Sequence, residues 1–139
     1  VWAQRDSYGA PLQRLQVIKG WYDHGPDKQT KEKIYDVACS DGLKVDPQSH
    51  RCPDNKAQVN LSDCSISNNG ASELKTVWTD PDFEEGVESF YYVRVLENPT
   101  CRWTTWDAIR SGATVRPGLQ VTIQERAWSS PIWYKINNN

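Results

Sequence analysis

Apolar residues alternate with polar residues in most segments of this chain that could form regular structure, and this period of two constrains the fold most. The segment 12–22 shows the pattern clearly. Leu15, Val17 and Trp21 share one face of the strand that it predicts, and Lys19 is the exception on that face. A chain patterned in this way is expected to bury alternating side chains in β-sheets.

Further alternating segments extend this prediction along the chain. The segment 90–96 is the strongest strand signal, because aromatic and β-branched residues occupy both of its faces, as in a central strand covered on each side. The segment 104–112 instead predicts a short helix, with a capping threonine, an acid in its first turn and a glycine after its end. Other strands are predicted at 34–39, 74–78, 121–128 and 132–134. Together these elements predict an all-β fold, an antiparallel β-sandwich of the immunoglobulin or fibronectin type with one short helix.

Three of the four cysteines lie in or beside a polar, turn-rich insertion at about 40–73, and the fourth, Cys101, lies further along the chain. A loop of this length without regular structure is uncommon in a compact domain, so covalent cross-links are the expected reason for its order. An even number of cysteines favours two disulfides formed in an oxidising compartment. A four-cysteine zinc site is the alternative, but zinc ligands usually come in pairs about two to four residues apart, and these gaps are wider. The residues concerned are Cys39, Cys52, Cys64 and Cys101.

The pairing of these cysteines is not encoded in the sequence, since four cysteines permit three connectivities. The stretch from Cys52 to Cys64 could close on itself, which would leave Cys39 to pair with Cys101, and we favour this arrangement among the three. Each closed loop is expected to contribute about 3 kcal/mol to stability in the chain-entropy model.

The length of 139 residues fits one domain, expected at 1–136, with a disordered tail at 137–139. The chain contains no methionine and begins at Val1, so we expect that a segment preceded it. Its 16 basic and 18 acidic residues are scattered, which argues against a nucleic-acid partner. No apolar run approaches the roughly 20 residues that cross a bilayer, so no membrane span is expected. With the cysteines, these features predict a periplasmic or secreted protein.

Few residues could form a catalytic centre, because the chain has only two histidines. His50 lies close in sequence to Asp54, but a loop histidine near an aspartate is more often a surface residue. No catalytic residue, metal or cofactor is therefore expected in this chain, and His50 and Asp54 are the best site candidates that it offers. Calcium is the alternative, although the twelve-residue calcium loop with its glycine and final glutamate is missing. Its ligands would come from Asp41, Asp46, Asp54 and Asp63.

Seven tryptophans are present, an unusual number for a chain of this length. Trp21, Trp78 and Trp128 alternate with other apolar residues in predicted strands, so we expect them to be buried. The group formed by Arg102, Trp103 and Trp106 is less regular and is the candidate interface patch. Stacking of exposed tryptophans against sugar rings is the alternative to burial.

Four segments of the chain resemble a known family. They are 5–14, 35–42, 90–103 (FYYVRVLENPTCRW) and 124–134 (QERAWSSPIWY), and the third is the most specific. They are similar to the C-terminal end of bacterial proteins in domain-of-unknown-function family 3604. Members of that family are several times longer, and their N-terminal part resembles metal-dependent hydrolases of the polymerase-and-histidinol-phosphatase type. None of the ligand motifs of those hydrolases matches a position in this chain.

The resemblance implies that the chain is a non-catalytic, structural or accessory C-terminal module of a larger exported protein, and that this larger protein is a metal-dependent hydrolase. The N-terminal remainder of that protein would then be its partner. Two other functions stay open. The chain could bind carbohydrate through exposed tryptophans, or it could be a protein-interaction domain that associates with itself.

Overall fold

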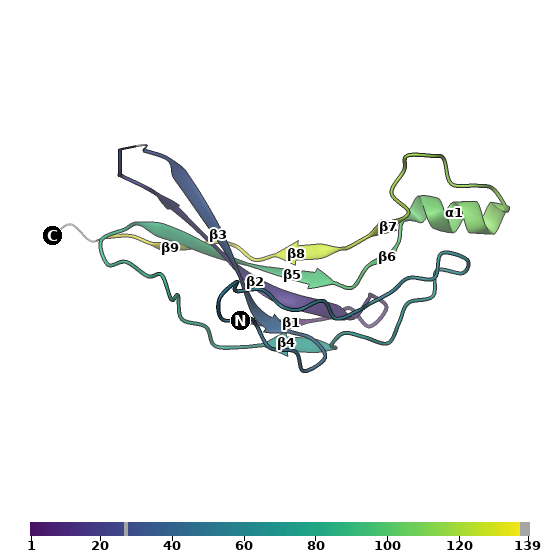
Figure 1. The fold of residues 1–139 in the computed structure, drawn as a ribbon, viewed down its shortest axis with the longest axis horizontal. Coiled ribbons are helices and arrows are strands. Elements are labelled where there is room, and N and C mark those ends of the chain that lie inside the picture. The colour runs from purple at the N-terminus through teal and green to yellow at the C-terminus, as the bar shows by residue number, and fades with distance from the viewer. Residues whose placement is uncertain (27, 137–139) are drawn as a thin grey trace.

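The computed structural model describes residues 1–26 and 28–136, and over these residues the chain is mainly β. Its largest sheet is antiparallel and has the strand order β3-β2-β5, with β8 and β9 both paired to the free side of β5 (Figure 1). Strand β5 is therefore central, as its two apolar faces predicted. The strands of this sheet are β2 (Leu12–Tyr22), β3 (Thr30–Cys39), β5 (Ser89–Glu97), β8 (Arg126–Trp128) and β9 (Ile132–Tyr134).

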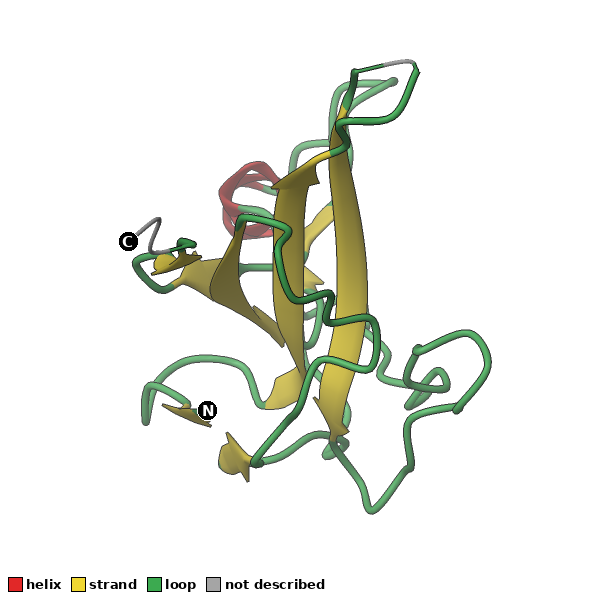
Figure 2. Cartoon of the chain, turned by 90° about the vertical axis from the view of Figure 1, so that its left-hand side faces the viewer, coloured by secondary structure: helices red, strands yellow, loops and turns green. Residues whose placement is uncertain are grey.

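Two short ribbons complete the described structure. One ribbon lies near the N-terminus and is not paired with a strand of the large sheet (Figure 2). The second ribbon carries the helix at the end of the molecule opposite to β9 (Figure 1). The first ribbon joins β1 (Trp2–Gln4) to β4 (Glu73–Lys75), the second joins β6 (Thr100–Cys101) to β7 (Thr122–Ile123), and the helix is α1 (Trp103–Ser111).

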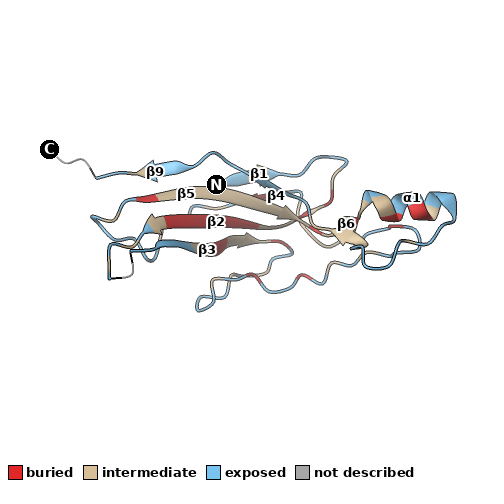
Figure 3. Ribbon diagram, turned by 90° about the horizontal axis from the view of Figure 1, so that it is seen from above, coloured by how far each residue is buried: buried red, intermediate tan, exposed pale blue. Residues whose placement is uncertain are grey.

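The core forms where the β1–β4 ribbon packs against one face of β2. Leu12, Leu15 and Leu74 are its buried members, with exposed fractions of 2%, 0% and 7%. Each buried leucine contributes about 1.5–3 kcal/mol of hydrophobic stabilisation. Figure 3 shows that β2 is buried along most of its length, whereas β9 is exposed. The ribbon thus covers only one part of one face of the large sheet.

The predicted architecture is confirmed as mainly β and antiparallel, with one short helix and a disulfide-stapled loop. The bounds predicted for 12–22 and 132–134 agree with β2 and β9. The strand predicted at 74–78 ends at Lys75, and the one predicted at 121–128 is divided into β7 and β8. The immunoglobulin-like topology stays a prediction, and the predicted tail at 137–139 lies outside the described residues.

The helix ends as predicted but begins differently. Gly112 adopts the left-handed conformation, with φ of 66°, and its N–H donates to the last carbonyls of the helix. The N-cap is Arg102 rather than a threonine, and it makes no side-chain capping bond. The predicted acid, Asp107, lies beyond the first turn, so the expected N-terminal signals were wrong.

The disulfides join Cys39 to Cys52 and Cys64 to Cys101, so the pairing favoured from sequence was wrong. The reason is that the chain after β3 turns back along the edge of β3. The amide of Asp36 donates to the carbonyl oxygen of His50 at 2.9 Å. The amide of Cys52 then donates to the Asp36 carboxylate at 2.7 Å, which brings Cys52 beside Cys39.

Hydrogen bonds as well as disulfides order the polar insertion. Asn55 is buried at its centre, where its amide nitrogen donates to the side-chain oxygen of Asn98 at 2.9 Å. Its amide oxygen accepts from Gln13 at 3.2 Å, which connects the insertion to β2. Asn98 in turn donates to the backbone carbonyl of Asn69 at 2.7 Å. A buried polar network of this kind fixes one arrangement of an otherwise irregular segment.

Candidate functional site

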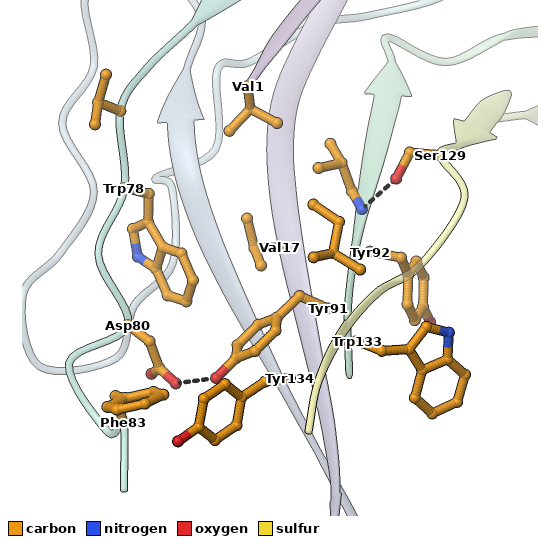
Figure 4. A pocket seen from close by; sticks show the side chains of 13 residues that line it. Val1, Val17, Trp78, Asp80, Phe83, Tyr91, Tyr92, Ser129, Trp133 and Tyr134 are labelled. Carbon is orange, nitrogen blue, oxygen red and sulfur yellow. Dashed lines mark hydrogen bonds between the residues drawn. The ribbon is translucent and has the colours of Figure 1, made fainter. Parts of the chain in front are cut away.

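A largely apolar groove of about 560 Å³ lies between the segment 77–83 and the strands β5 and β9 (Figure 4). We call it the groove. Its walls are mainly aromatic and aliphatic, which is the usual character of a binding surface in proteins. The lining side chains include Val1, Val77, Trp78, Asp80, Phe83, Tyr91, Ile132, Trp133 and Tyr134.

Strand register places one wall of the groove. Tyr91 pairs with Ile132, and Ser89 pairs with Tyr134, in the antiparallel ladder between β5 and β9. Residues directly opposite each other in a ladder project to the same face. Tyr91, Ile132 and Tyr134 therefore project together into the groove. Alternation along two strands is sufficient to build this wall.

The segment 77–83 forms the facing wall, and aromatic contacts hold it over the sheet. The Trp78 ring lies 5.1 Å from the ring of Tyr35 and 6.4 Å from the ring of Tyr91, measured between centroids. The Phe83 ring meets the ring of Tyr134 edge-on at 5.1 Å. Aromatic pairs at such spacings contribute about 0.5–1.5 kcal/mol each beyond the area that they bury.

A buried ion pair lies beside the groove, where Asp80 is a lining residue, and it explains why Lys19 interrupts the apolar face of β2. The ammonium of Lys19 lies 2.7 Å from a carboxylate oxygen of Asp80, and the two side chains are only 5% and 7% exposed. Lys19 also donates to the backbone carbonyl of Asp82 at 2.6 Å. The Tyr91 hydroxyl donates to the same Asp80 oxygen at 2.8 Å. Burial and this bond to Asp80 raise the pKa of Tyr91 to about 12.

A second set of polar contacts fixes the turn that follows Asp80. The Asp82 carboxylate accepts from the ammonium of Lys33 and from the hydroxyl of Tyr35. Lys33, followed by Tyr35, holds the pKa of the Asp82 carboxyl below its usual value. Burial, followed by the bond to Asp82, raises the pKa of Tyr35 above its usual value. The groove wall is therefore attached to β2, β3 and β5 by ionic and phenolic groups.

A second hollow, of about 470 Å³, lies on the opposite face of the sheet and extends across β2, β3, β5 and β9. We call it the outer pocket. Gly20, Phe90 and Trp133 are partners across three adjacent strands, so all three project to this face. The Phe90 ring occupies the space that a side chain at Gly20 would need, since a Cβ there would lie 2.3 Å from the ring. Trp133 and Tyr134 line both the groove and the outer pocket.

Comparison with known proteins places the chain in a family. The model of the family described as "Protein of unknown function (DUF3604)" matches residues 1–136. The chain belongs to this family. No curated protein and no solved structure matches it.

The DUF3604 chain exposes its tryptophans far more than the sequence predicted. Trp128 was expected to be buried and is 58% exposed, because it lies on the sheet face that the β1–β4 ribbon does not cover. Trp21 and Trp78 are only half-buried. Trp2 and Trp133 are 65% and 62% exposed. The prediction of burial rested on the alternation of Trp21, Trp78 and Trp128 with other apolar residues in predicted strands.

The structure does not bring the candidate catalytic residues together. The His50 ring packs edge-on against the Tyr35 ring at 5.3 Å. Asp54 accepts the backbone amide of Lys56 in a local turn, and this bond lowers the pKa of its carboxyl. Within residues 1–26 and 28–136, no three His, Cys, Asp or Glu residues form a group that could hold a metal.

The candidate calcium ligands also serve local turns. Asp46 accepts hydrogen bonds from the amide and hydroxyl of Ser49. Asp63 makes the same pair of bonds with Ser65. Asp41 instead accepts the amide of Gly70 at 2.8 Å. These aspartates shape the polar insertion.

The candidate interface patch lies on and before α1, away from the groove (Figure 1). Trp103 is 70% exposed and Arg102 is half-buried, and both line a hollow of about 730 Å³. Trp106 is 38% exposed, and the guanidinium of Arg110 lies 5.5 Å from the centre of its ring. This cation–π contact occupies one face of the Trp106 ring.

The sequence did not indicate the groove or the outer pocket. The segment 132–134 was predicted as a strand, but its exposure depends on its place at the edge of the sheet. A signal was available in its composition, because Ile132, Trp133 and Tyr134 carry no charge. Edge strands of soluble proteins usually carry charged residues that discourage pairing with another strand.

No helix among the described residues is long and apolar enough to cross a membrane.

Proposed function

We propose that this DUF3604 chain is a non-catalytic structural module of a larger exported protein, and that it docks through the groove onto the remainder of that protein. The observation that carries this proposal is the exposure of large apolar side chains around one groove. Val77 is 97% exposed, Ile132 is 72% exposed and Phe83 is 49% exposed. Exposure of such side chains to water is unfavourable, and covering them with another protein surface lowers the free energy.

The exposed area is of the size expected for an interaction site. Whole aromatic side chains bury about 150–250 Å², so Phe83 and Trp133 together leave roughly 250 Å² exposed. Val1, Val77 and Ile132 add to the same surface. The patch thus reaches the few hundred Å² that mark interaction sites on monomers. It would form the apolar centre of an interface that buries about 800 Å² on each partner.

The non-catalytic role is supported by what the polar residues already do. The buried Asp36 carboxylate accepts from Arg14 at 3.0 Å and from Gln16 at 2.6 Å. It also accepts the backbone amide of Cys52. The Asp80 carboxylate is likewise occupied by Lys19 and by the Tyr91 hydroxyl. These carboxylates stabilise the fold through partners that leave little capacity for a substrate.

The location and the partner follow from the same proposal. Two disulfides support export to an oxidising compartment, either the periplasm or the extracellular space. The partner is the N-terminal remainder of the longer polypeptide, which we propose to be a metal-dependent hydrolase. Catalysis in that protein would then belong to the remainder, with this module stabilising it.

Association in trans tests the docking. Residues 1–139 and the remaining polypeptide would be expressed separately, and their affinity measured by calorimetry. We expect a stable complex that Phe83→Lys weakens at least tenfold, because an interface that buries this ring gains about 1.5–3 kcal/mol from it. Leu119→Lys is the matched control, since Leu119 is also 49% exposed but lies outside the groove. Failure of the two parts to associate, or equal weakening by both variants, would contradict the docking role.

Turnover assays test the non-catalytic role. Residues 1–139 alone would be incubated with phosphomonoester and ester substrates and added divalent metals. We expect no turnover above the rate without protein. Reproducible turnover that His50→Ala abolishes would show that this chain has a catalytic centre of its own.

Carbohydrate binding is a second candidate function, and the hollow beside α1, which has both aromatic and polar lining residues, is the observation that favours it. Trp103 offers an exposed aromatic face there, and Arg102, Arg116 and Gln120 offer hydrogen-bond donors around it. An aromatic face with convergent polar groups is suited to a sugar ring. Binding on a glycan array that Trp103→Ala abolishes would support this function, and an absence of binding across the array would remove it.

A further inference from the structure

The hollow beside α1 is lined by cationic and aromatic side chains and by no carboxylate of the described residues. Arg102 and Arg116 lie in its walls, and Trp103 presents a ring to it. Within residues 1–26 and 28–136, neither guanidinium forms an ion pair or a side-chain hydrogen bond. Two such groups around one hollow are suited to an anion, because each guanidinium can donate two parallel hydrogen bonds to a carboxylate or a similar oxyanion.

Carboxylates at this end of the molecule leave the two guanidinium groups uncompensated. The acids closest to them in sequence or through a disulfide are Asp63, Asp107 and Glu125, and none of the three lines the hollow. The Asp63 carboxylate accepts two hydrogen bonds within its own turn. The segment 100–123, from β6 to β7, carries three arginines and one aspartate in a chain whose formal charge is −2. The surroundings of the hollow are therefore more cationic than the rest of the chain.

The start of α1 adds to this positive potential. Amides in the first turn of a helix carry partial positive charge, which an acceptor side chain at the N-cap or an acid in the first turn usually compensates. In this helix the N-cap is Arg102, which makes no side-chain capping bond, and the first turn contains no acid. The arginine thus adds a cation to an end of the helix that already favours anions.

The hydroxyl of Thr104 is a separate indication of a missing acceptor. Thr104 lines the hollow, and its hydroxyl oxygen is buried without a hydrogen-bond partner. It is the single buried side-chain polar atom in this state among residues 1–26 and 28–136. Buried polar groups are nearly always paired, so this hydroxyl calls for a partner that the chain does not itself supply.

We propose that the hollow beside α1 binds an acidic sugar of a polysaccharide, whose carboxylate or sulfate group is held by Arg102 and Arg116. This inference rests on carbohydrate binding, the second candidate function above, and names the class of sugar. The anionic group accepts hydrogen bonds from the two guanidinium groups and from the amides at the start of α1. The sugar ring packs against Trp103, and Gln120 binds its hydroxyl groups.

A sugar unit suits the hollow better than a bare inorganic anion does. The volume of about 730 Å³ lies within the range of about 300–1,000 Å³ that is usual for small-molecule pockets. Trp103 and Leu119 are 70% and 49% exposed, and they supply apolar contact area that an inorganic anion would leave uncovered. A ring with one apolar face, several hydroxyl groups and one anionic group uses every part of this lining.

Calorimetry with matched oligosaccharides tests this proposal on residues 1–139. Three galactose-based oligosaccharides of equal length would be compared: an oligogalacturonate, a sulfated galactan and a neutral galactan. We expect at least one acidic oligosaccharide to bind at least tenfold more tightly than the neutral one, with an affinity that falls as salt is added. The comparison of the two acidic oligosaccharides shows whether the anionic group is a carboxylate or a sulfate. Acetate and inorganic sulfate test whether an anion alone is sufficient, and we expect neither to compete at equal concentration.

Two substitutions in the hollow locate the anionic group. Arg116→Gln removes an exposed guanidinium, and we expect the affinity for the acidic oligosaccharide to fall at least tenfold while that for the neutral one is unchanged. Thr104→Val keeps the shape of the side chain without its hydroxyl and should weaken acidic binding by about threefold to tenfold. Arg110→Gln is the matched control, because it removes the same charge from α1 at a residue that contacts Trp106 and does not line the hollow.

The outcomes separate this inference from carbohydrate binding itself. If neutral and acidic oligosaccharides bind equally tightly and Trp103→Ala abolishes both, carbohydrate binding stands and the preference for acidic sugars is wrong. If no oligosaccharide binds, both fail. Equal weakening by Arg116→Gln and Arg110→Gln, or equal binding of acetate or inorganic sulfate, would also overturn the proposal. Circular dichroism of each variant shows whether the fold is retained.

Discussion

Replacement of Asp80 by asparagine is the most informative perturbation of the fold, because it leaves the Lys19 ammonium buried beside the groove without its counter-ion. Both side chains are more than nine-tenths buried, and the ammonium lies 2.7 Å from the carboxylate. The Asp82 carbonyl and the amide oxygen of the new side chain can still accept from Lys19 in the variant, but neither carries the negative charge that compensates the ammonium. Asparagine is close in size to aspartate, so the substitution changes charge and not packing.

The expected magnitude follows from this burial. Removal of one partner of a buried ion pair costs about 3–5 kcal/mol, whereas an exposed pair contributes about 0–1 kcal/mol. For a domain with a total stability of about 5–15 kcal/mol, the loss is a large fraction. With a urea m-value of about 2 kcal/mol per molar, a loss of 4 kcal/mol lowers the unfolding midpoint by about 2 M.

Urea unfolding of four proteins measures the effect: the original chain, Asp80→Asn, Lys19→Met and the double variant. Lys19→Met is expected to cost less than Asp80→Asn, because Asp80 keeps the hydroxyl of Tyr91 and the amide of Asp82 as donors. The double variant buries no unpaired ammonium, so it should recover at least about 2 kcal/mol relative to the sum of the single changes. A loss below about 1 kcal/mol for Asp80→Asn, or simple additivity, would refute the assignment of a buried pair.

Three other results are expected. The Tyr91 phenol has a pKa near 12 in the folded chain and an ordinary value of 10.0 when unfolded, so its contribution to folding stability is complete below pH 10 and is lost as the pH rises towards 12. Tyr91→Phe should remove this part of the loss of stability at alkaline pH, and ultraviolet titration of tyrosinate formation measures the pKa. Gly70→Ala should destabilise the chain by at least about 1 kcal/mol, because φ at Gly70 is 107° and a Cβ there would lie 2.4 Å from Pro11. An unchanged melting temperature in thermal unfolding would contradict this expectation. Removal of the disulfide between Cys64 and Cys101, which closes a separation of 37 residues, should cost about 4 kcal/mol in chemical denaturation, and a cost below 1 kcal/mol would mean that the insertion needs no such cross-link.

Local sequence pattern predicted the parts of this fold that depend on neighbouring residues. The alternation in 12–22 placed β2 correctly and also singled out Lys19, whose position the structure explains by its ion pair with Asp80. Gly112 correctly predicted the end of the helix, because a residue in the left-handed conformation ends many helices and glycine adopts that conformation readily. These features are decided within one strand or one turn.

Features that depend on distant residues were not predictable in this way. The disulfide pairing was decided by hydrogen bonds from Asp36 and Cys52 along the edge of β3, and those bonds join residues whose proximity no local pattern reveals. The exposure of Trp128 and Trp133 was decided by which face of the sheet the β1–β4 ribbon covers. Alternation shows that a side chain projects to a face, but it does not show whether a second layer covers that face.

Hydroxyl-radical footprinting of the full-length polypeptide tests the docking account most directly. Oxidation of Phe83 should be at least tenfold slower than in residues 1–139 alone, because the docked remainder would cover this ring in the groove. Oxidation of Leu119, which is also 49% exposed but lies outside the groove, should be equally fast in both proteins. Equally fast oxidation of Phe83 in the two proteins would contradict the account.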